Sequence, residues 1–219
     1  FPNLDKKKVK RIYNGVENIF FQIKNLKQKI KDKKLKNLSQ KKIILFVGDR
    51  RKKYKNFFLT VDIVSKLKKE FVLVCIGGEE INQIEKNFIN NKIPGRFYHF
   101  SKVSSEKLNQ IYNISFCLVY PSLYEGFGLP ILEAMKAGCP VISTKNSSIK
   151  EIAKDAAILI NKVNKENFIK SINLINDTKL RNSLVKKGFM RSKIFSWDKC
   201  AEETLKFYEE IYKIKFKQK

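Results

Sequence analysis

Residues 120–133 read Tyr-Pro-Ser-Leu-Tyr-Glu-Gly-Phe-Gly-Leu-Pro-Ile-Leu-Glu. An apolar run over 114–120 leads into this stretch, and helix-forming residues occupy 131–137, so the order is strand, glycine-rich turn and helix. Backbone N–H groups in such a turn and at a helix start bind anions, above all phosphate. Glu125 and Glu133 suit a ligand whose hydroxyls lie near that phosphate. Singly, such carboxylates also compensate a helix dipole or line a solvated helix face; the whole string predicts a sugar-nucleotide site.

The same rhythm of strand and helix extends outward from this stretch. Continuous apolar runs predict buried strands, and periodic apolar residues between them predict helices. The expected strands are 43–47, 71–76, 96–100, 115–120, 140–143 and 157–160. The expected helices are 56–69, 81–88, 104–112 with a cap at Ser104, 128–137 and 147–153, followed by further helices from 165 onward. This alternation predicts an α/β fold: a Rossmann-like, doubly wound parallel sheet flanked by helices, with C-terminal helices.

Composition narrows the classes of function. The chain has 219 residues, 43% of them hydrophobic, enough for one ordinary domain with extensions. No apolar run is long enough to span a bilayer, and the first ten residues do not resemble a secretory signal. The four cysteines lack metal-ligand spacing, so we expect free thiols in the cytoplasm and no metal site.

The net charge of +25 is carried by 40 lysines and only six arginines among 46 basic residues. Two explanations stay open: the compositional bias of an AT-rich coding sequence, and attraction to the inner face of an anionic membrane. Nucleic acid is not an expected partner, because the chain has no RNP motif, zinc finger or basic-aromatic interleaving.

Candidate ligand-binding residues follow three of the expected strands. Gly48 to Asn56 comes after the first strand, Gly77-Gly78 after the second, and Ser122 to Gly128 after the fourth. Because ligands of open parallel sheets bind at the carboxyl ends of the strands, these segments are expected to converge at one edge.

Together these motifs resemble a known family. Gly48-Asp-Arg, Tyr54-Lys-Asn and the run from Pro121 to Ile142 are similar to group 1 (family 4) retaining glycosyltransferases of the GT-B fold. The segments 147–157 and 195–201 continue the resemblance, which covers about residues 11 to 212. It implies that this chain is the C-terminal, donor-binding half of such an enzyme.

The resemblance implies three catalytic residues. Arg50 and Lys55 would hold the donor diphosphate and stabilise charge on the leaving nucleotide, and Glu125 would contact hydroxyls of the transferred sugar. No Asp-x-Asp motif is present, so no metal or cofactor is expected. Asp49 departs from the small polar residue common in the family, and Arg50 or Arg51 must offset its charge.

The resemblance also implies a donor-binding surface, made of Gly48, Val103, Gly126, Phe127, Gly128, Leu129 and Glu133. Gly48 would permit close backbone approach, and the loop 101–103 would receive the base. The backbone over 126–129 would face the phosphates and the sugar. Glu133 would accept hydrogen bonds from the ribose hydroxyls.

Three parts of the chain are expected. Residues 1–40 form a basic, interdomain-type segment with a short strand over 11–16 and a helix over 19–30. Residues 41–195 form the Rossmann-like domain that binds the nucleotide sugar. Residues 196–219 form a helix that would cross to an N-terminal acceptor domain absent from this chain, or reach a partner chain.

The expected function is that of a retaining hexosyltransferase donor domain, which uses a nucleotide diphosphate sugar such as GDP- or UDP-hexose. The acceptor would be a glycan or a lipid-linked glycan, and the isolated chain would have little or no activity. Two alternatives stay open: a non-catalytic module that binds nucleotide or docks on a membrane or partner, and a GT-B sugar-nucleotide epimerase. The Glu-Gly-Phe-Gly-Leu-Pro string weighs against the epimerase.

Overall fold

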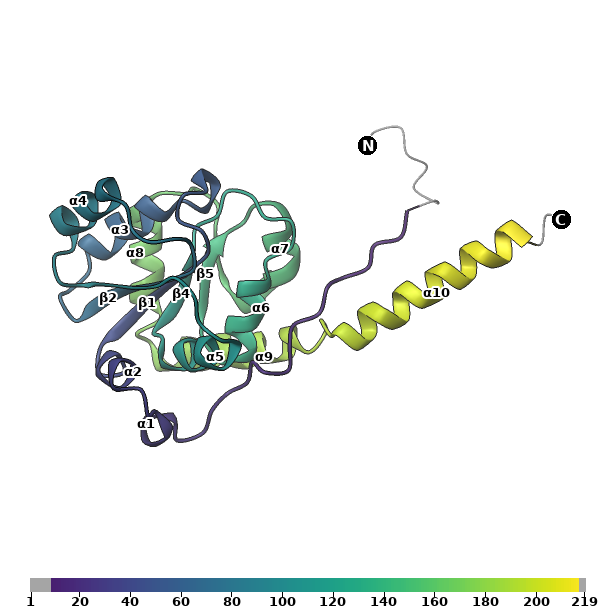
Figure 1. Cartoon of the computed structure of the whole chain (residues 1–219), viewed down its shortest axis with the longest axis horizontal. Helices are drawn as coiled ribbons and strands as arrows, with labels where there is room; N and C mark the ends of the chain where they lie inside the picture. The colour runs from purple at the N-terminus through teal and green to yellow at the C-terminus, as the bar shows by residue number, and fades with distance from the viewer. Residues whose placement is uncertain (1–8, 217–219) are drawn as a thin grey trace.

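The computed structural model describes residues 9–216, which fold around one parallel sheet (Figure 1). The sheet has six strands in the order β3-β2-β1-β4-β5-β6, and every neighbouring pair is parallel. The strands are β1 (Lys42–Val47), β2 (Phe71–Ile76), β3 (Phe97–Phe100), β4 (Cys117–Tyr120), β5 (Val141–Thr144) and β6 (Ile158–Ile160). The predicted fold class is confirmed, and each of these strands lies within two residues of its predicted bounds.

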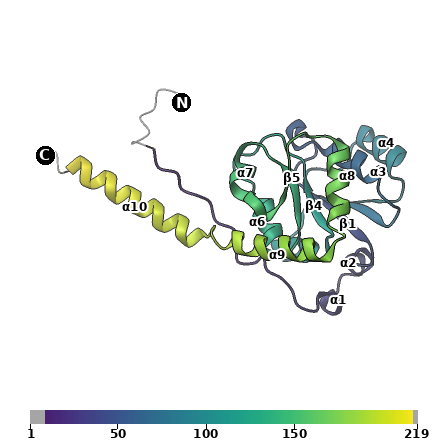
Figure 2. The same cartoon turned by 180° about the vertical axis from the view of Figure 1, so that it is seen from behind.

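Helices cover both faces of the sheet. They are α1 (Leu26–Lys29), α2 (Lys33–Leu38), α3 (Phe57–Ser65), α4 (Gln83–Lys92), α5 (Ser105–Ile114), α6 (Leu129–Lys136), α7 (Ser147–Ala153), α8 (Lys165–Leu174), α9 (Thr178–Ser192) and α10 (Trp197–Phe216), with 3₁₀ turns η2 (Lys53–Lys55) and η3 (Lys154–Ala156). In the view from behind, α8 lies in front of the sheet, and α9 runs along its lower edge (Figure 2).

The alternation of side chains along β1 explains why both faces are covered. Ile43 and Leu45 join one core with residues of α2, α5, α6 and α7, whereas Ile44 and Phe46 join a second core with residues of α3, α4, α8 and α9. All four side chains are at most 1% exposed. Because each such burial is worth about 1.5–3 kcal/mol, a strand that is apolar at five successive positions fits only between two helical layers.

Among the helices predicted over residues 56–153, two differ from their predicted bounds by more than two residues at one end. The helix expected over 56–69 ends at Ser65, and the one expected over 81–88 runs from Gln83 to Lys92. A capping box fixes the second start: the Asn82 side chain accepts from the Glu85 N–H, and the Glu85 carboxylate accepts from the Asn82 N–H.

The N-terminal segment departs furthest from prediction. Residues 11–16 form no strand, and of the helix expected over 19–30 only Leu26–Lys29 is helical. Side-chain amides of α5 form hydrogen bonds with backbone N–H and carbonyl groups that a helix would use for its own hydrogen bonds. Asn113 accepts from the Ile23 N–H and donates to the Phe21 carbonyl, while Asn109 accepts from the Phe21 N–H. The segment therefore lies extended along α5.

Helix α10 projects away from the body, with the residues near the N-terminus running beside it (Figure 1). The Lys10 ammonium lies 3.0 Å from the Glu210 carboxylate and 5.5 Å from the centre of the Phe207 ring. Of the helix predicted over 196–219, Trp197–Phe216 is helical, and its crossing to another domain stays a prediction. Among the residues described, no helix combines the length and apolarity needed to cross a bilayer.

Candidate functional site

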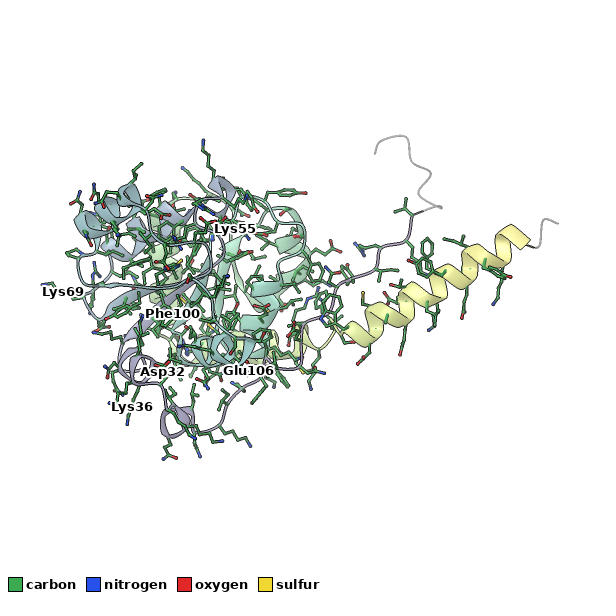
Figure 3. The ribbon with its side chains drawn as sticks, viewed as in Figure 1. Asp32, Lys36, Lys55, Lys69, Phe100 and Glu106 are labelled. Atoms are coloured by element: carbon green, nitrogen blue, oxygen red, sulfur yellow. The ribbon has the colours of Figure 1, made fainter. Side chains whose placement is uncertain are left out.

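The candidate site lies where β1 and β4 end. These strands are neighbours in the sheet, so the loops that follow them meet at its carboxyl edge, and Figure 3 shows Lys55 there, far from Asp32 and Lys36. Gly48 follows β1 with a φ of +143°, and a Cβ built on it would lie 3.5 Å from the Lys55 side chain. A residue with a side chain would be strained at this φ, so Gly48 lets the loop bring Lys55 back over the end of β1.

Lys55, Tyr120 and Glu125 form a hydrogen-bonded group at this edge. The Lys55 ammonium donates to the Glu125 carboxylate at 2.6 Å and to the Tyr120 hydroxyl at 2.7 Å. The Lys55 and Glu125 side chains are 14% and 11% exposed. Burial and the neighbouring Glu125 charge raise the pKa of Tyr120, so its hydroxyl stays protonated. The structure therefore brings together two of the three predicted catalytic residues.

The glycine-rich turn is anchored by the start of α7. Ser147 accepts from the Glu125 N–H at 2.9 Å, and the Ser148 hydroxyl bonds the carbonyls of Glu125 and Phe127 at 2.8 and 2.9 Å. Within the described residues, no acceptor bonds the N–H groups of residues 126–129, the last of which begins α6. Aligned, unused N–H groups at a helix start are suited to an anion.

The glycines of this turn serve different purposes. Gly128 has a φ of +110°, which favours glycine, but a Cβ on Gly126 would meet nothing within 4 Å. The chain's own packing therefore does not require glycine at 126, and the open space beside its backbone is available to a ligand.

Glu133 lies one turn further along α6. Its carboxylate accepts a hydrogen bond from the buried Tyr112 hydroxyl of α5 at 2.9 Å. Burial raises the pKa of Glu133, against the lowering effect of that hydrogen bond. The second carboxylate oxygen has no partner among the described residues, so it can accept from a ligand hydroxyl.

Arg50 is not part of this group. Its side chain is 0% exposed and turns toward the ends of β2 and β3, with Nε 3.3 Å from Glu85. Its terminal nitrogens donate to the carbonyls of Gly77 at 2.9 Å and Glu79 at 2.5 Å, and one lies 2.7 Å from His99 Nε2. The sequence expectation that Arg50 touches the donor diphosphate does not fit this placement, because the chain itself occupies the guanidinium.

The neighbouring Asp49 is balanced by Arg51. The Asp49 carboxylate accepts from the Arg51 N–H at 3.1 Å, and the Arg51 guanidinium lies 2.8 Å from Glu79. Burial opposes ionisation of Asp49, yet the bonds and charge of Arg51 outweigh it and lower the pKa. The expected offset of this anion is therefore supplied by Arg51.

Val103 stands apart from the polar group. It is half-buried and packs against the core beneath α5, one residue before the cap Ser104, whose hydroxyl accepts from the Lys107 N–H at 3.3 Å. Sequence reasoning missed Tyr120 and the anchoring role of Ser147 and Ser148. The sequence offered one signal for Tyr120, which is its position at the end of the strand that leads into the glycine-rich turn.

The described residues contain no group of three or more His, Cys, Asp or Glu placed to hold a metal ion. Cys75, Cys117 and Cys139 are buried, and burial raises the thiol pKa of Cys75 and Cys139 to about 12. These thiols contribute packing.

Comparison with known proteins finds a family. The model of glycosyl transferases group 1 matches residues 27–191. O-antigen chain mannosyltransferase B of Escherichia coli is 34% identical over 120 residues, which are 52% of this chain and 30% of that protein. The crystal structure of HepE from Anabaena in complex with UDP-glucose has a TM-score of 0.78 at 15% identity, covering 92% of this chain and 57% of HepE.

The match is partial in length. The chain spans about a third to just over half of the curated relatives it matches. By contrast, it covers 97% of a solved C-terminal domain of a glycosyl transferase group 1 family protein (LpcC) from Francisella tularensis. That match covers 82% of this chain, with 25% identity and a TM-score of 0.68. The similarity thus lies in one domain of the longer proteins.

Proposed function

Because this chain belongs to the group 1 glycosyl transferases, we propose that it binds a nucleotide diphosphate sugar and supports retaining transfer of a hexose. The acceptor is a glycan or a lipid-linked glycan, held by a domain or partner outside this chain. Two relatives support this reading: a mannosyltransferase of O-antigen chains, and a structural neighbour solved with UDP-glucose.

The observation that carries the proposal is the Lys55–Glu125 pair beside the unused N–H groups of residues 126–129. The Lys55 and Glu125 side chains are only 14% and 11% exposed, so removing their charges from water costs free energy. Because this cost can cancel the attraction between the two charges, the pair is weak evidence for a stabilising role. A diphosphate bound at the turn gives the ammonium a second anionic partner. It also gives the N–H groups acceptors.

The chemistry of sugar transfer matches these groups. When the bond between the anomeric carbon and the diphosphate breaks, negative charge develops on the leaving group and positive charge on the sugar. Lys55 and the amides of the turn stabilise the first. Glu125 holds hydroxyls of the sugar and lies near the second. The Tyr120 hydroxyl fixes the position of the Lys55 ammonium.

Glu133 supplies the ribose contact in this proposal. Its unpartnered oxygen accepts from a ribose hydroxyl, while the Tyr112 hydroxyl holds the other oxygen in place. Gly126 leaves room for the ligand against the backbone, Gly48 lets the loop bring Lys55 to that ligand, and Val103 borders the base. Arg50 acts indirectly, by holding the ends of β2 and β3.

The test is a panel of UDP, GDP, ADP and their hexose conjugates, measured by thermal shift and calorimetry. A ligand at 100 times its Kd stabilises the chain by about 2.7 kcal/mol. Lys55→Met removes charge-assisted bonds worth about 1.5–3 kcal/mol, so it should weaken nucleotide binding at least about tenfold. Lys52→Met, in the same loop but exposed, is the matched control and should change nothing.

Glu125→Gln distinguishes contacts to the sugar from contacts to the nucleotide. It should weaken binding of the hexose conjugate while leaving the free nucleotide diphosphate unchanged. If no nucleotide binds, or if Lys52→Met lowers affinity as much as Lys55→Met, the proposed site is wrong. Nucleotide binding without activity, even with the acceptor domain of a longer relative supplied, would favour a non-catalytic module.

A further inference from the structure

The segment from Thr178 to Trp197 has an unusual charge pattern: six basic residues and no acidic one. Two of the six turn inward. Arg181 donates to the Phe116 carbonyl at 2.7 Å, and Arg191 donates to the carbonyls of Glu151 and Ile152 at 2.6 and 2.8 Å. The remaining four are lysines, at positions 179, 186, 187 and 193. The inner face of α9 therefore binds the domain, and its outer face carries lysines.

Apolar side chains are exposed among these lysines. Phe189, Met190 and Ile194 are 40%, 58% and 46% exposed. Met190 and Ile194 line a groove of about 780 Å³ together with the three lysines at 186, 187 and 193. The Lys193 ammonium lies 4.4 Å from the centre of the Phe189 ring.

We define the α9 outer patch as Lys186, Lys187, Phe189, Met190, Lys193 and Ile194. One acidic residue borders it, Asp155, whose carboxylate lies 2.9 Å from Lys187.

We propose that the α9 outer patch docks this domain on an anionic lipid bilayer. A helix whose exposed face combines lysines with apolar side chains fits the boundary between headgroups and acyl chains. The lysine stems lie along the apolar region while their ammonium groups reach lipid phosphates. The chain's net charge of +25 supplies long-range attraction, and the patch supplies the apolar contact that fixes an orientation.

The aliphatic side chains favour a bilayer over nucleic acid, the other common polyanion. Nucleic acids bind through phosphates, which pair with basic side chains, and through bases, which stack on flat aromatic side chains. Met190 and Ile194 gain little there, whereas a bilayer removes them from water.

The position of the patch is compatible with the proposed donor site. The Arg181 contact places α9 against Phe116, the residue before β4, and so at the amino end of that strand. Figure 2 shows α9 along the side of the sheet away from the loops that carry the donor site. A bilayer at the patch therefore leaves the carboxyl edge open to water, where nucleotide sugars are dissolved.

The experiment uses vesicles of phosphatidylcholine alone and of phosphatidylcholine mixed with phosphatidylglycerol. Met190→Ser with Ile194→Ser should weaken binding to the mixed vesicles at least about fivefold without changing net charge. Lys186→Gln with Lys193→Gln should weaken it about tenfold or more, because each lysine near an anionic surface contributes about a fivefold factor. Lys68→Gln with Lys69→Gln, exposed and before β2, is the control of equal charge.

A fluorescent reporter locates the contact. The chain has one tryptophan, so Met190→Trp in a Trp197→Phe background places the only indole in the patch. Its emission should shift to the blue with mixed vesicles, whereas Ile84→Trp in the same background should not shift. Ile84 is 76% exposed and lies on α4, away from α9 in Figure 2.

Three results would overturn the proposal. The first is equal loss of vesicle binding in the two lysine pairs, which would leave only diffuse charge attraction. The second is an unshifted Met190→Trp emission on bound vesicles. The third is a blue shift in the absence of lipid. A shift that grows with protein concentration would assign the patch to contact with a second copy of the chain, and a shift on addition of single-stranded DNA would assign it to nucleic acid. Circular dichroism confirms that each variant is folded.

Discussion

Replacing the buried Arg50 with methionine should destabilise the domain and affect nucleotide binding only through that loss. Methionine keeps much of the apolar stem but removes the guanidinium, which is fully buried. The Glu85 carboxylate, only 4% exposed, then stays in place without its cation. The carbonyls of Gly77 and Glu79 lose a donor each.

The magnitude follows from these contacts. Leaving one partner of a buried ion pair uncompensated costs about 3–5 kcal/mol. The Glu85 carboxylate keeps the bond from the Asn82 N–H, which places the expected loss toward the lower end, about 3–4 kcal/mol. Against a typical total of about 5–15 kcal/mol, this is a large fraction of the stability.

Urea unfolding at neutral pH measures the loss directly. Arg50→Met should lower the midpoint strongly, and the double variant Arg50→Met/Glu85→Gln should recover part of the loss because it removes the unpaired charge. Arg51→Met removes only a surface ion pair, with an arginine side chain that is 48% exposed, and should cost at most about 1 kcal/mol. If Arg50→Met proves as stable as the parent chain but no longer binds nucleotide diphosphate, then Arg50 is a phosphate ligand. The interpretation that Arg50 only holds the ends of β2 and β3 would then be wrong.

Three further predictions test the site. Tyr120→Phe removes the hydroxyl that fixes the Lys55 ammonium and should weaken nucleotide diphosphate binding about three- to tenfold, the worth of one hydrogen bond, by calorimetry. Gly126→Ala should leave stability within about 1 kcal/mol of the parent yet weaken nucleotide binding, whereas Gly128→Ala, at a φ of +110°, should lower the melting temperature. Glu133→Gln should stabilise the ligand-free chain at neutral pH, because burial raises the pKa of this carboxyl and charging it in the fold is unfavourable.

The sign of the Glu133 effect fixes its pH window. A carboxyl whose pKa is raised in the folded state holds its proton longer there than in the unfolded chain. Its contribution is therefore most favourable below the ordinary value of 4.5 and is lost as the pH rises through the raised folded pKa. The gain from Glu133→Gln should grow over that window. A gain independent of pH would contradict this reasoning.

The outcomes for the other two variants are equally definite. Tyr120→Phe with unchanged affinity would mean that Glu125 alone positions the ammonium. Gly126→Ala with unchanged affinity would mean that no ligand approaches the backbone at this residue, since the chain itself leaves that space open.

Local sequence patterns predict much of the fold. β1 and β2 are apolar at nearly every position, and only a strand buried on both faces accommodates such a run. Ser104 caps α5 as its position before a helical pattern predicts. The turn after β4 lies where its glycines and Glu125 indicated, because strand, turn and helix are set by neighbours in the chain.

The path of residues 11–30 could not be derived from the sequence. Its apolar spacing is compatible with a helix, but Asn109 and Asn113 on α5 take its backbone hydrogen bonds. These partners lie about ninety residues away, so no local pattern reports them. Tertiary contacts overrode the helical preference.

The roles of the two predicted cations were likewise separated only by the tertiary structure. In the sequence, Arg50 and Lys55 look alike: basic residues in one loop after β1. In the structure Lys55 meets Glu125, and Arg50 is enclosed by Gly77, Glu79 and Glu85. The sequence by itself determined the parallel sheet and the edge where the candidate ligand-binding segments meet, because both follow from local periodicity and from strand polarity. Which side chains face the candidate site depends on contacts between distant loops, and only folding brings those loops together.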